Sequence, residues 1–180
     1  MFRTRKRGET MSTCNEAVEK AQRLVQLHST RDADRLAEAI GLIVVPRRFK
    51  KQKGVYTVIE RNRYVFIKDD LHPAMHNIVL LHEIGHDVLH RAYAVENGGF
   101  QEFDIFDTAD RRMEFEANVF ASQVALPDDE FLEYVNLGYS ASQIAKAMNS
   151  DVNLVALKID HLNNLGHVLI PQEHKRDFLK

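Results

Sequence analysis

The chain has 180 residues, of which 44% are hydrophobic and 28% charged, and its formal net charge is −2 at pH 7. These values are typical of one ordinary globular domain, and the slightly acidic balance gives no general electrostatic reason to bind nucleic acid or an anionic membrane. Uninterrupted apolar runs fall far short of the ~20 residues that a membrane helix needs, and the first residues lack the apolar segment of a signal peptide. Cys14 is the single cysteine, which excludes an intramolecular disulfide and a cysteine-based zinc finger. We therefore expect a cytoplasmic protein.

The first part of the chain predicts two helices followed by a small sheet. Capping and periodicity signals place the helices at residues 13–28 and 32–40. Short β-branched runs predict strands at residues 42–45, 54–59 and 63–67, and the last two form a β-hairpin. We expect these strands to make a small antiparallel sheet beside the helix that follows.

The strongest chemical signal is the HExxH segment at residues 82–86, on a predicted helix that begins near Pro73. Residues four apart on an α-helix lie one turn apart on nearly the same face, so His82 and His86 can bind one metal ion. Glu83 points about 100° away, where it can reach a water on that metal without being a ligand. Two neutral imidazoles and a third protein ligand would hold Zn²⁺ and leave a position for a water whose pKa falls toward ~7. Glu83 would act as the general base for that water.

Chance could also produce this segment, with ordinary helical histidines and a solvated glutamate. The predicted helix, the apolar turn before the motif and a candidate third ligand downstream favour the metal site. Gly85 inside the helix indicates close approach by a neighbouring element. His90 lies one turn further along, and its direction drifts about 80° from His82, so we expect it to support a ligand or cap the helix rather than bind the metal. His72 and His76 repeat the four-residue spacing without the acid, so we expect ordinary polar residues there.

A second helix, predicted at residues 108–121, supplies the candidates for the third ligand. We expect Glu114 to complete the set, with Glu116 as the alternative third ligand; a merely charged helix face is the remaining interpretation. Small residues such as Ala117 would let this helix press against the glycine of the motif. Thermolysin-like enzymes brace a metal histidine with an acid four residues after the third ligand. Asn118 has that position here, and its amide oxygen could accept an imidazole N–H bond without a carboxylate's charge.

Three further helices are predicted at residues 128–135, 140–148 and 152–165. The last two have the spacing of a helix-turn-helix, yet the second of them carries few basic residues. We therefore expect it to serve helix packing or to offer a docking surface for a repressor, rather than to contact DNA. Residues 93–107 predict either a loop pinned by phenylalanines or a mobile arm, and residues 168–171 could add a short strand.

Three stretches together resemble the ImmA/IrrE-type metallopeptidases, which are often encoded on prophages and integrative elements. These stretches are Leu36–Gly41, the HExxH helix through Leu89-His90, and Glu114–Ala121 with Ala125-Leu126-Pro127 beyond it. The similarity extends from about Glu16 to Gly166, and its specificity lies in the combination, because many zinc peptidases share HExxH. It implies a cytoplasmic zinc protease that cleaves a helix-turn-helix repressor, usually encoded next door, and so relieves repression of a mobile element.

We therefore predict an α+β fold, mostly helical, in which a small antiparallel sheet lies beside the HExxH helix as in zincins. The predicted organisation is a basic flexible N-terminus at residues 1–12, a zinc metallopeptidase domain at residues 13–171 with a C-terminal helical part at about 128–166, and a charged tail at residues 172–180. The predicted function is zinc-dependent hydrolysis of a peptide bond in a helix-turn-helix repressor. The alternative is a non-proteolytic, zinc-containing module that regulates a repressor or toxin by binding it. We expect neither a membrane nor nucleic acid as a direct partner.

Overall fold

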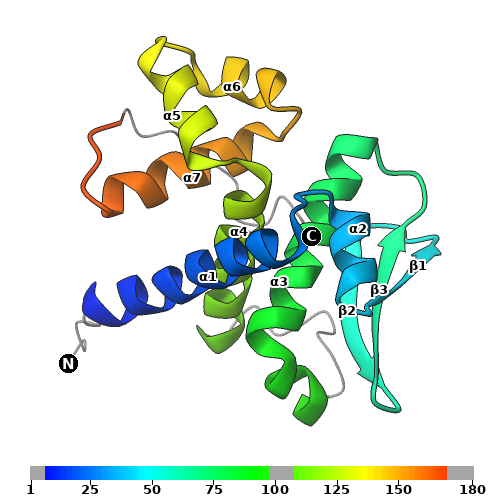
Figure 1. The fold of residues 1–180 in the computed structure, drawn as a ribbon. Coiled ribbons are helices and arrows are strands. Elements are labelled where there is room, and N and C mark those ends of the chain that lie inside the picture. Colours follow the sequence, from blue (N-terminus) through cyan, green and yellow to red (C-terminus); the bar gives the residue numbers. More distant parts are fainter. Residues whose placement is uncertain (1–6, 98–107, 170–180) are drawn as a thin grey trace.

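The helix that carries the HExxH segment, α3 (Pro73–Asn97), runs through the centre of the molecule (Figure 1). The structure, a computed structural model, describes residues 7–97 and 108–169. Within those ranges the chain forms an α+β domain of seven helices and one three-stranded sheet, which confirms the predicted fold class. The other helices are α1 (Arg7–His28), α2 (Ala33–Ala39), α4 (Thr108–Ala125), α5 (Asp128–Asn136), α6 (Ala141–Ala147) and α7 (Val152–Asn164).

The sheet is mixed rather than wholly antiparallel. Its strands are β1 (Ile43–Arg47), β2 (Gly54–Ile59) and β3 (Asn62–Lys68), in the spatial order β1-β3-β2. The predicted β2–β3 hairpin is antiparallel, whereas β1 pairs in parallel with β3. Because β3 lies between β1 and β2, these two strands, which are consecutive in the chain, do not pair with each other. A hairpin is signalled by local sequence, but the partner of β1 is set by this longer-range arrangement.

A two-residue turn closes the hairpin. Glu60 and Arg61 both have positive φ, 49° and 68°, which is the backbone of a primed turn that matches the right-handed twist of the flanking strands. The sequence predicted a longer connection that included Asn62, but Asn62 already pairs with Ile59 at the start of β3. The shorter turn fixes the register of both strands.

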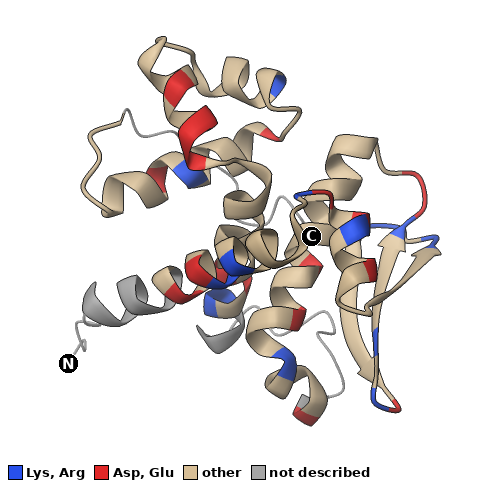
Figure 2. Cartoon of the chain, in the orientation of Figure 1, with Lys and Arg blue, Asp and Glu red and all other residues tan. Residues whose placement is uncertain are grey.

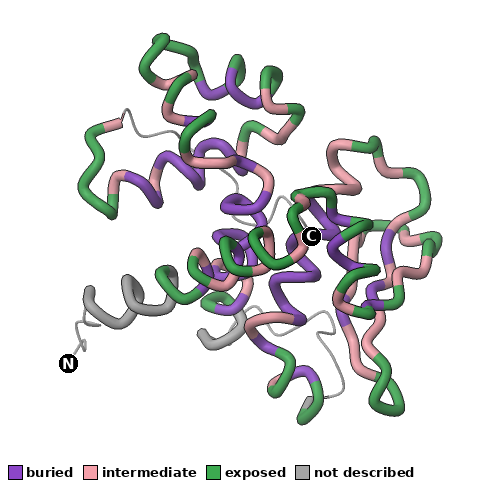
Figure 3. Tube along the Cα trace, in the orientation of Figure 1, coloured by how far each residue is buried: buried purple, intermediate pink, exposed green. Residues whose placement is uncertain are grey.

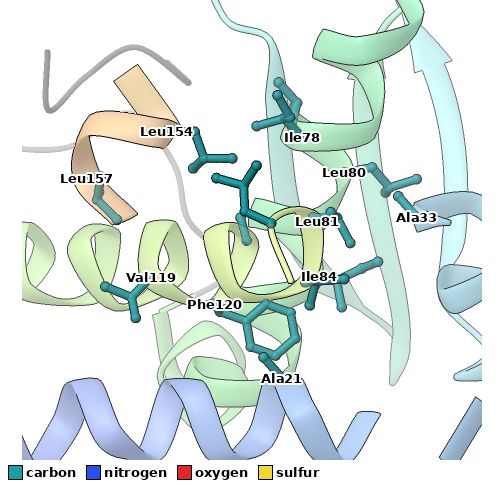
Figure 4. Close-up of a cluster of buried hydrophobic side chains, with 14 of the residues drawn as sticks. Ala21, Ala33, Ile78, Leu80, Leu81, Ile84, Val119, Phe120, Leu154 and Leu157 are labelled. Atoms are coloured by element: carbon teal, nitrogen blue, oxygen red, sulfur yellow. The ribbon is translucent and has the colours of Figure 1, made fainter. Parts of the chain in front are cut away.

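The helix α3 separates two layers of the domain. It packs against β2 and β3 on one side and against α4 on the other, and α4 also contacts α1 and α7 (Figure 1). Buried positions are concentrated along α3, α4 and α7 (Figure 3). Figure 4 shows the apolar side chains of this core, which include Leu81, Ile84, Phe120, Leu154 and Leu157. Burying each such side chain stabilises the fold by about 1.5–3 kcal/mol, so this core holds the two layers together.

The C-terminal helices α5, α6 and α7 follow the predicted boundaries closely. Ser140 starts α6 with a capping box: its hydroxyl accepts a bond from the Gln143 N–H, and the Gln143 side chain accepts one from the Ser140 N–H. Asn149 has a positive φ of 48° in the turn before α7. A short turn thus joins α6 to α7, at the position where the sequence predicted a helix-turn-helix spacing.

The second helix of this pair, α7, is packed into the domain. Residues 154–159, 161 and 162 are buried, and the helix lies against α4. The Lys158 ammonium is fully buried, 2.5 Å from a carboxylate oxygen of Asp128 and 2.5 Å from the side-chain oxygen of Gln123. Most of the surface of α7 is thus used for contacts inside the protein, in accordance with the expected packing role.

Several predicted boundaries shift. The first helix begins at Arg7 rather than near residue 13, and β1 extends through Pro46, which an edge strand tolerates. Residues 93–97 of the predicted arm belong to α3, and its remainder, 98–107, lies outside the described residues. Val168 and Leu169 are not in a strand, and the rest of the predicted strand and the charged tail lie outside the described residues, as do residues 1–6.

The surface carries charges of both signs. Figure 2 shows lysine and arginine positions interspersed with aspartate and glutamate positions along the helices and the hairpin, in keeping with the small net charge. Among residues 7–97 and 108–169, no helix combines the length and the apolarity that crossing a membrane would require.

The helices α3 and α4 approach each other closely at Gly85. A Cβ atom added there would lie 3.2 Å from the Cα of Ala117 and 3.2 Å from a ring carbon of Phe120. These separations are tighter than ordinary van der Waals contact, so the two helices meet at this point because Gly85 has no side chain. The close approach that a glycine inside the helix predicted is confirmed.

We expect Gly85→Val to lower the free energy of unfolding by about 1–3 kcal/mol, because the added carbons force α3 away from α4. Urea unfolding of the metal-free protein, followed by circular dichroism, measures the change. Ala92→Val is the matched control, since it places the same side chain at an exposed position of the same helix and should cost only the helix-propensity difference of about 0.5 kcal/mol. Equal losses in the two variants would contradict a close helix contact at Gly85.

Candidate metal centre

Three side chains from α3 and α4 converge on one point. His82 Nε2 and His86 Nε2 are 3.0 Å apart. The Glu114 carboxylate lies across from both, 3.4 Å from His82 Nε2 and 3.5 Å from His86 Nε2. These atoms all lie within 4.8 Å of one another, so the group could hold a metal ion.

The separations fit a tetrahedral ion. Ligand atoms bound at about 2.0–2.2 Å with tetrahedral angles lie about 3.3–3.6 Å from one another. Each histidine nitrogen lies at such a separation from its nearer Glu114 oxygen, Oε2 for His82 and Oε1 for His86, so small shifts of the carboxylate and of the two nitrogens would complete a tetrahedral set. Two imidazoles and one carboxylate are also the donor set of zinc peptidases that keep one position open for water. The residues present therefore fit such an ion.

The structure separates the two glutamates that the sequence left as alternatives. Glu114 faces His82 and His86, whereas Glu116 points to another part of α3, with its Oε2 atom 3.0 Å from His90 Nε2. The two acids are two residues apart on α4, which turns their side chains about 200° from each other. Only one of them can therefore face the histidine pair.

The inner nitrogen of each histidine has a partner. His82 Nδ1 lies 2.8 Å from the amide oxygen of Asn118, the residue that the sequence proposed as a brace. His86 Nδ1 lies 3.2 Å from His90 Nδ1. His90 occupies a kink in α3, where its φ of −125° and ψ of 17° leave the helical region. All of these side chains are buried, so contacts at Nδ1 restrain the orientation of both the His82 and the His86 ring.

Glu83 sits between the histidine pair and the sheet. It is only 5% exposed and hydrogen-bonds the backbone N–H of Tyr56 in β2. A Cβ atom at Gly54 would lie 2.6 Å from the Glu83 carboxylate, so the carboxylate occupies space that this glycine leaves free. Burial raises the pKa of Glu83 to about 7. Sequence analysis missed Gly54, although a glycine in a strand often marks a close approach to the backbone.

A buried carboxylate beside the motif, Asp87, ties the sheet to α3. It accepts hydrogen bonds from the Tyr56 hydroxyl at 2.7 Å, from Arg63 at 2.7 Å, and from Arg91 at 2.9 and 3.1 Å. Arg63 also donates to the backbone carbonyl of Ile40 at the end of α2. No local sequence pattern singles out this cluster, because its side chains come from three separate elements, β2, β3 and α3. Its position next to His86 keeps β2 in place beside the candidate site.

Comparison with known proteins identifies the family. The family model described as the IrrE N-terminal-like domain (Peptidase_M78) matches residues 37–159, which is more than half of the chain and includes every residue of the candidate site. The chain belongs to this IrrE N-terminal-like peptidase family. It is also similar to the uncharacterised immunity region protein 2 of Bacillus phage phi105, with 32% identity over 149 residues, covering 82% of this chain and 88% of the phage protein. The resemblance indicated by the motifs is thereby confirmed.

The electrostatics of this peptidase-family site favour cation binding. Burial lowers the pKa of His86 to about 4, so its imidazole is neutral near pH 7. Burial also opposes a charge on His82, but its hydrogen bond with Glu114 and the charge of that acid raise the pKa of His82 above the ordinary value. For Glu114, burial acts in the opposite direction, yet hydrogen bonds from the two histidines hold its pKa well below the usual range. The group thus contains a carboxylate and one neutral imidazole ready for a metal.

Metal binding should release protons. Because the pKa of His82 is raised above its ordinary value, the metal-free protein carries a proton there more often than an unperturbed histidine would, and an ion bound at Nε2 must displace it. Zinc affinity should therefore rise with pH until the pKa of His82 is passed and then level off. Titration calorimetry in two buffers of different ionisation enthalpy should show net proton release on zinc binding, larger at pH 6.5 than at higher pH. Release of none would contradict the assignment of His82 as a ligand.

The partner of His82 should matter for affinity. Asn118→Leu removes the acceptor for the His82 Nδ1–H and should weaken zinc binding by about 10–100-fold. Asn118→Asp keeps an acceptor and adds a charge, so it should bind zinc at least as tightly as the wild type. Competition with a chromophoric chelator measures both constants. Equal affinities for the leucine variant and the wild type would show that Asn118 does not orient the ring.

Proposed function

We propose that this protein is a zinc-dependent endopeptidase that hydrolyses a peptide bond in a helix-turn-helix transcriptional repressor, relieving repression of a prophage or mobile element. The observation that carries the proposal is the convergence of His82, His86 and Glu114 with Glu83 beside them. Membership of a peptidase family supports the reaction class. The similarity to a phage immunity region protein supports the regulatory setting. A repressor substrate would place the enzyme in the cytoplasm.

In this proposal His82, His86 and Glu114 are the zinc ligands, and Glu83 is the general base. When bound, zinc would polarise the scissile carbonyl and lower the pKa of the attacking water toward ~7. Glu83 takes the proton from that water and donates it to the leaving amide nitrogen. A carboxyl group whose pKa is near 7 can perform both transfers at neutral pH.

The protein surroundings of Glu83 prepare it for this role. The Tyr56 N–H holds the carboxylate on the sheet side, and the absence of a side chain at Gly54 lets it lie there. The base is therefore oriented before substrate arrives, which removes part of the entropic barrier to proton transfer. Because Glu83 is buried, its charge also interacts more strongly with the reacting groups than it would in water.

The substrate would bind as an extended segment along β2. This strand lies at the edge of the sheet, packs against α3 and begins beside Glu83. An extended peptide can add to a sheet edge through backbone hydrogen bonds, with little dependence on its own sequence. The same strand would then orient both the general base and the peptide.

Glu83→Gln tests the reaction. The amide cannot accept a proton, so the variant should retain zinc and repressor binding while cleavage falls at least about a hundredfold. The purified zinc-loaded protein and the variant are incubated with the helix-turn-helix repressor encoded nearest to the gene, and fragments are identified by mass spectrometry. Discrete fragments with the wild type alone would support the protease.

The same experiment distinguishes the alternative. Intact repressor in both samples, together with stable co-elution of the two proteins, would favour a regulatory module that binds its partner without cutting it. Unchanged release of repression by Glu83→Gln in cells would likewise contradict proteolysis.

A further inference from the structure

A line of polar contacts leads from the candidate zinc ligands into the protein. His86 Nδ1 lies 3.2 Å from His90 Nδ1, and His90 Nε2 lies 3.0 Å from Glu116 Oε2. The second oxygen of Glu116, Oε1, accepts a bond from Arg112 Nε at 2.8 Å. His86, His90 and Glu116 are buried, and Arg112 at the far end is largely exposed. The line therefore joins a ligand to a buried carboxylate through one imidazole.

The ends of the line determine where each hydrogen atom lies. An ionised carboxylate only accepts hydrogen bonds, so His90 must carry a hydrogen on Nε2 to bind Glu116. His86 must leave Nε2 free for a metal, so the hydrogen of its neutral ring is on Nδ1. The bond between the two Nδ1 atoms then runs from His86 to His90. His90 consequently donates through Nε2 and accepts through Nδ1.

We propose that His90 and Glu116 are positioning residues that fix His86 in the tautomer whose Nε2 faces the metal. The proposal rests on the metal centre of the proposed function, but not on the peptidase reaction. The charge of Glu116 polarises the two rings in turn, which strengthens His86 Nε2 as an electron-pair donor. Arg112 orients the carboxylate from the outside.

The contacts fit this role better than simple packing. An aliphatic side chain could fill the site of either residue, whereas burying an imidazole and a carboxylate costs free energy unless both are paired. The two candidate ligands also differ in their hydrogen-bond partners. His82 contacts the uncharged amide of Asn118, whereas His86 contacts His90, which in turn contacts the Glu116 carboxylate. The two imidazoles would therefore bind the metal with unequal donor strength.

Nuclear magnetic resonance tests the tautomers directly. Long-range ¹H–¹⁵N correlation on the zinc-loaded protein, labelled at histidine, distinguishes which ring nitrogen carries hydrogen. We expect the hydrogen on Nδ1 for His86 and on Nε2 for His90, with signals assigned through His86→Gln and His90→Gln. A His90 ring with its hydrogen on Nδ1, or with hydrogens on both nitrogens, would overturn the proposal.

Variants test the energetic consequence. His90→Leu and Glu116→Leu should each weaken zinc binding by about 10–100-fold, because both interrupt the line behind His86. His90→Gln should retain more of the affinity than His90→Leu, since an amide can accept from His86 and donate to Glu116. His76→Leu is the matched control: this histidine is on the same helix and pairs with Asp34 near the surface, so its loss should leave zinc affinity unchanged. Circular dichroism confirms that each variant is folded.

The outcomes separate this inference from the proposed function. If the wild type binds zinc with the expected tautomers but cleaves no repressor, the protease proposal fails and the positioning proposal stands. If cleavage occurs but His90→Leu and Glu116→Leu bind zinc as tightly as the wild type, the positioning proposal fails. If a leucine variant does not fold, the tautomer measurement and His90→Gln test the positioning proposal instead. Zinc affinity of His90→Gln as low as that of His86→Gln, which lacks the candidate ligand, would overturn the positioning proposal.

Discussion

The contact of α4 with α3 at Gly85 controls the geometry of the candidate metal centre. His82 and His86 are placed by one helix alone, but the third member of the group, a carboxylate, must come from outside that helix. Because Gly85 has no side chain, Ala117 can approach closely, and Glu114, one turn earlier on α4, reaches the histidine nitrogens. A helix pair one methyl group further apart would move the carboxylate by an amount comparable with the tolerance of a metal–ligand bond. The catalytic proposal therefore depends on a packing contact between apolar surfaces.

Buried polar groups cluster around this contact, and each described one has a defined neighbour. The histidines of α3 are held by Asn118 and by each other, Glu83 by the backbone of β2, and Asp87 by a tyrosine and two arginines. In a medium of low polarity, leaving any of these groups without a partner would cost several kcal/mol. The same neighbours restrict how the side chains can rotate. The contacts that pair the buried polar groups are thus the same contacts that orient the side chains of the candidate site.

The parts of the structure that local sequence determines were predicted, and those that depend on contacts between distant elements were not. Helical periodicity sufficed to bring His82 and His86 together, and capping chemistry located α6. The choice between Glu114 and Glu116 depended on which face of α4 meets α3, which no local pattern encodes. The parallel pairing of β1 and the support of Glu83 by Gly54 likewise arise only when separate segments meet. A site formed by residues four apart on one helix is therefore easier to predict from sequence than a site formed by residues about thirty positions apart in the chain.

The burial of α7 bears on the helix-turn-helix spacing that the sequence predicts for α6 and α7. In DNA-binding proteins the second helix of this motif is inserted into the major groove, so it must be free of its own protein on that side. Freeing α7 here would expose Leu154, Val155 and Leu157, at about 1.5–3 kcal/mol each, and separate Lys158 from Asp128. That cost is comparable with the whole stability of an ordinary domain, about 5–15 kcal/mol. The helix that would read base pairs in a DNA-binding protein instead packs in this protein against α4, the helix that carries Glu114.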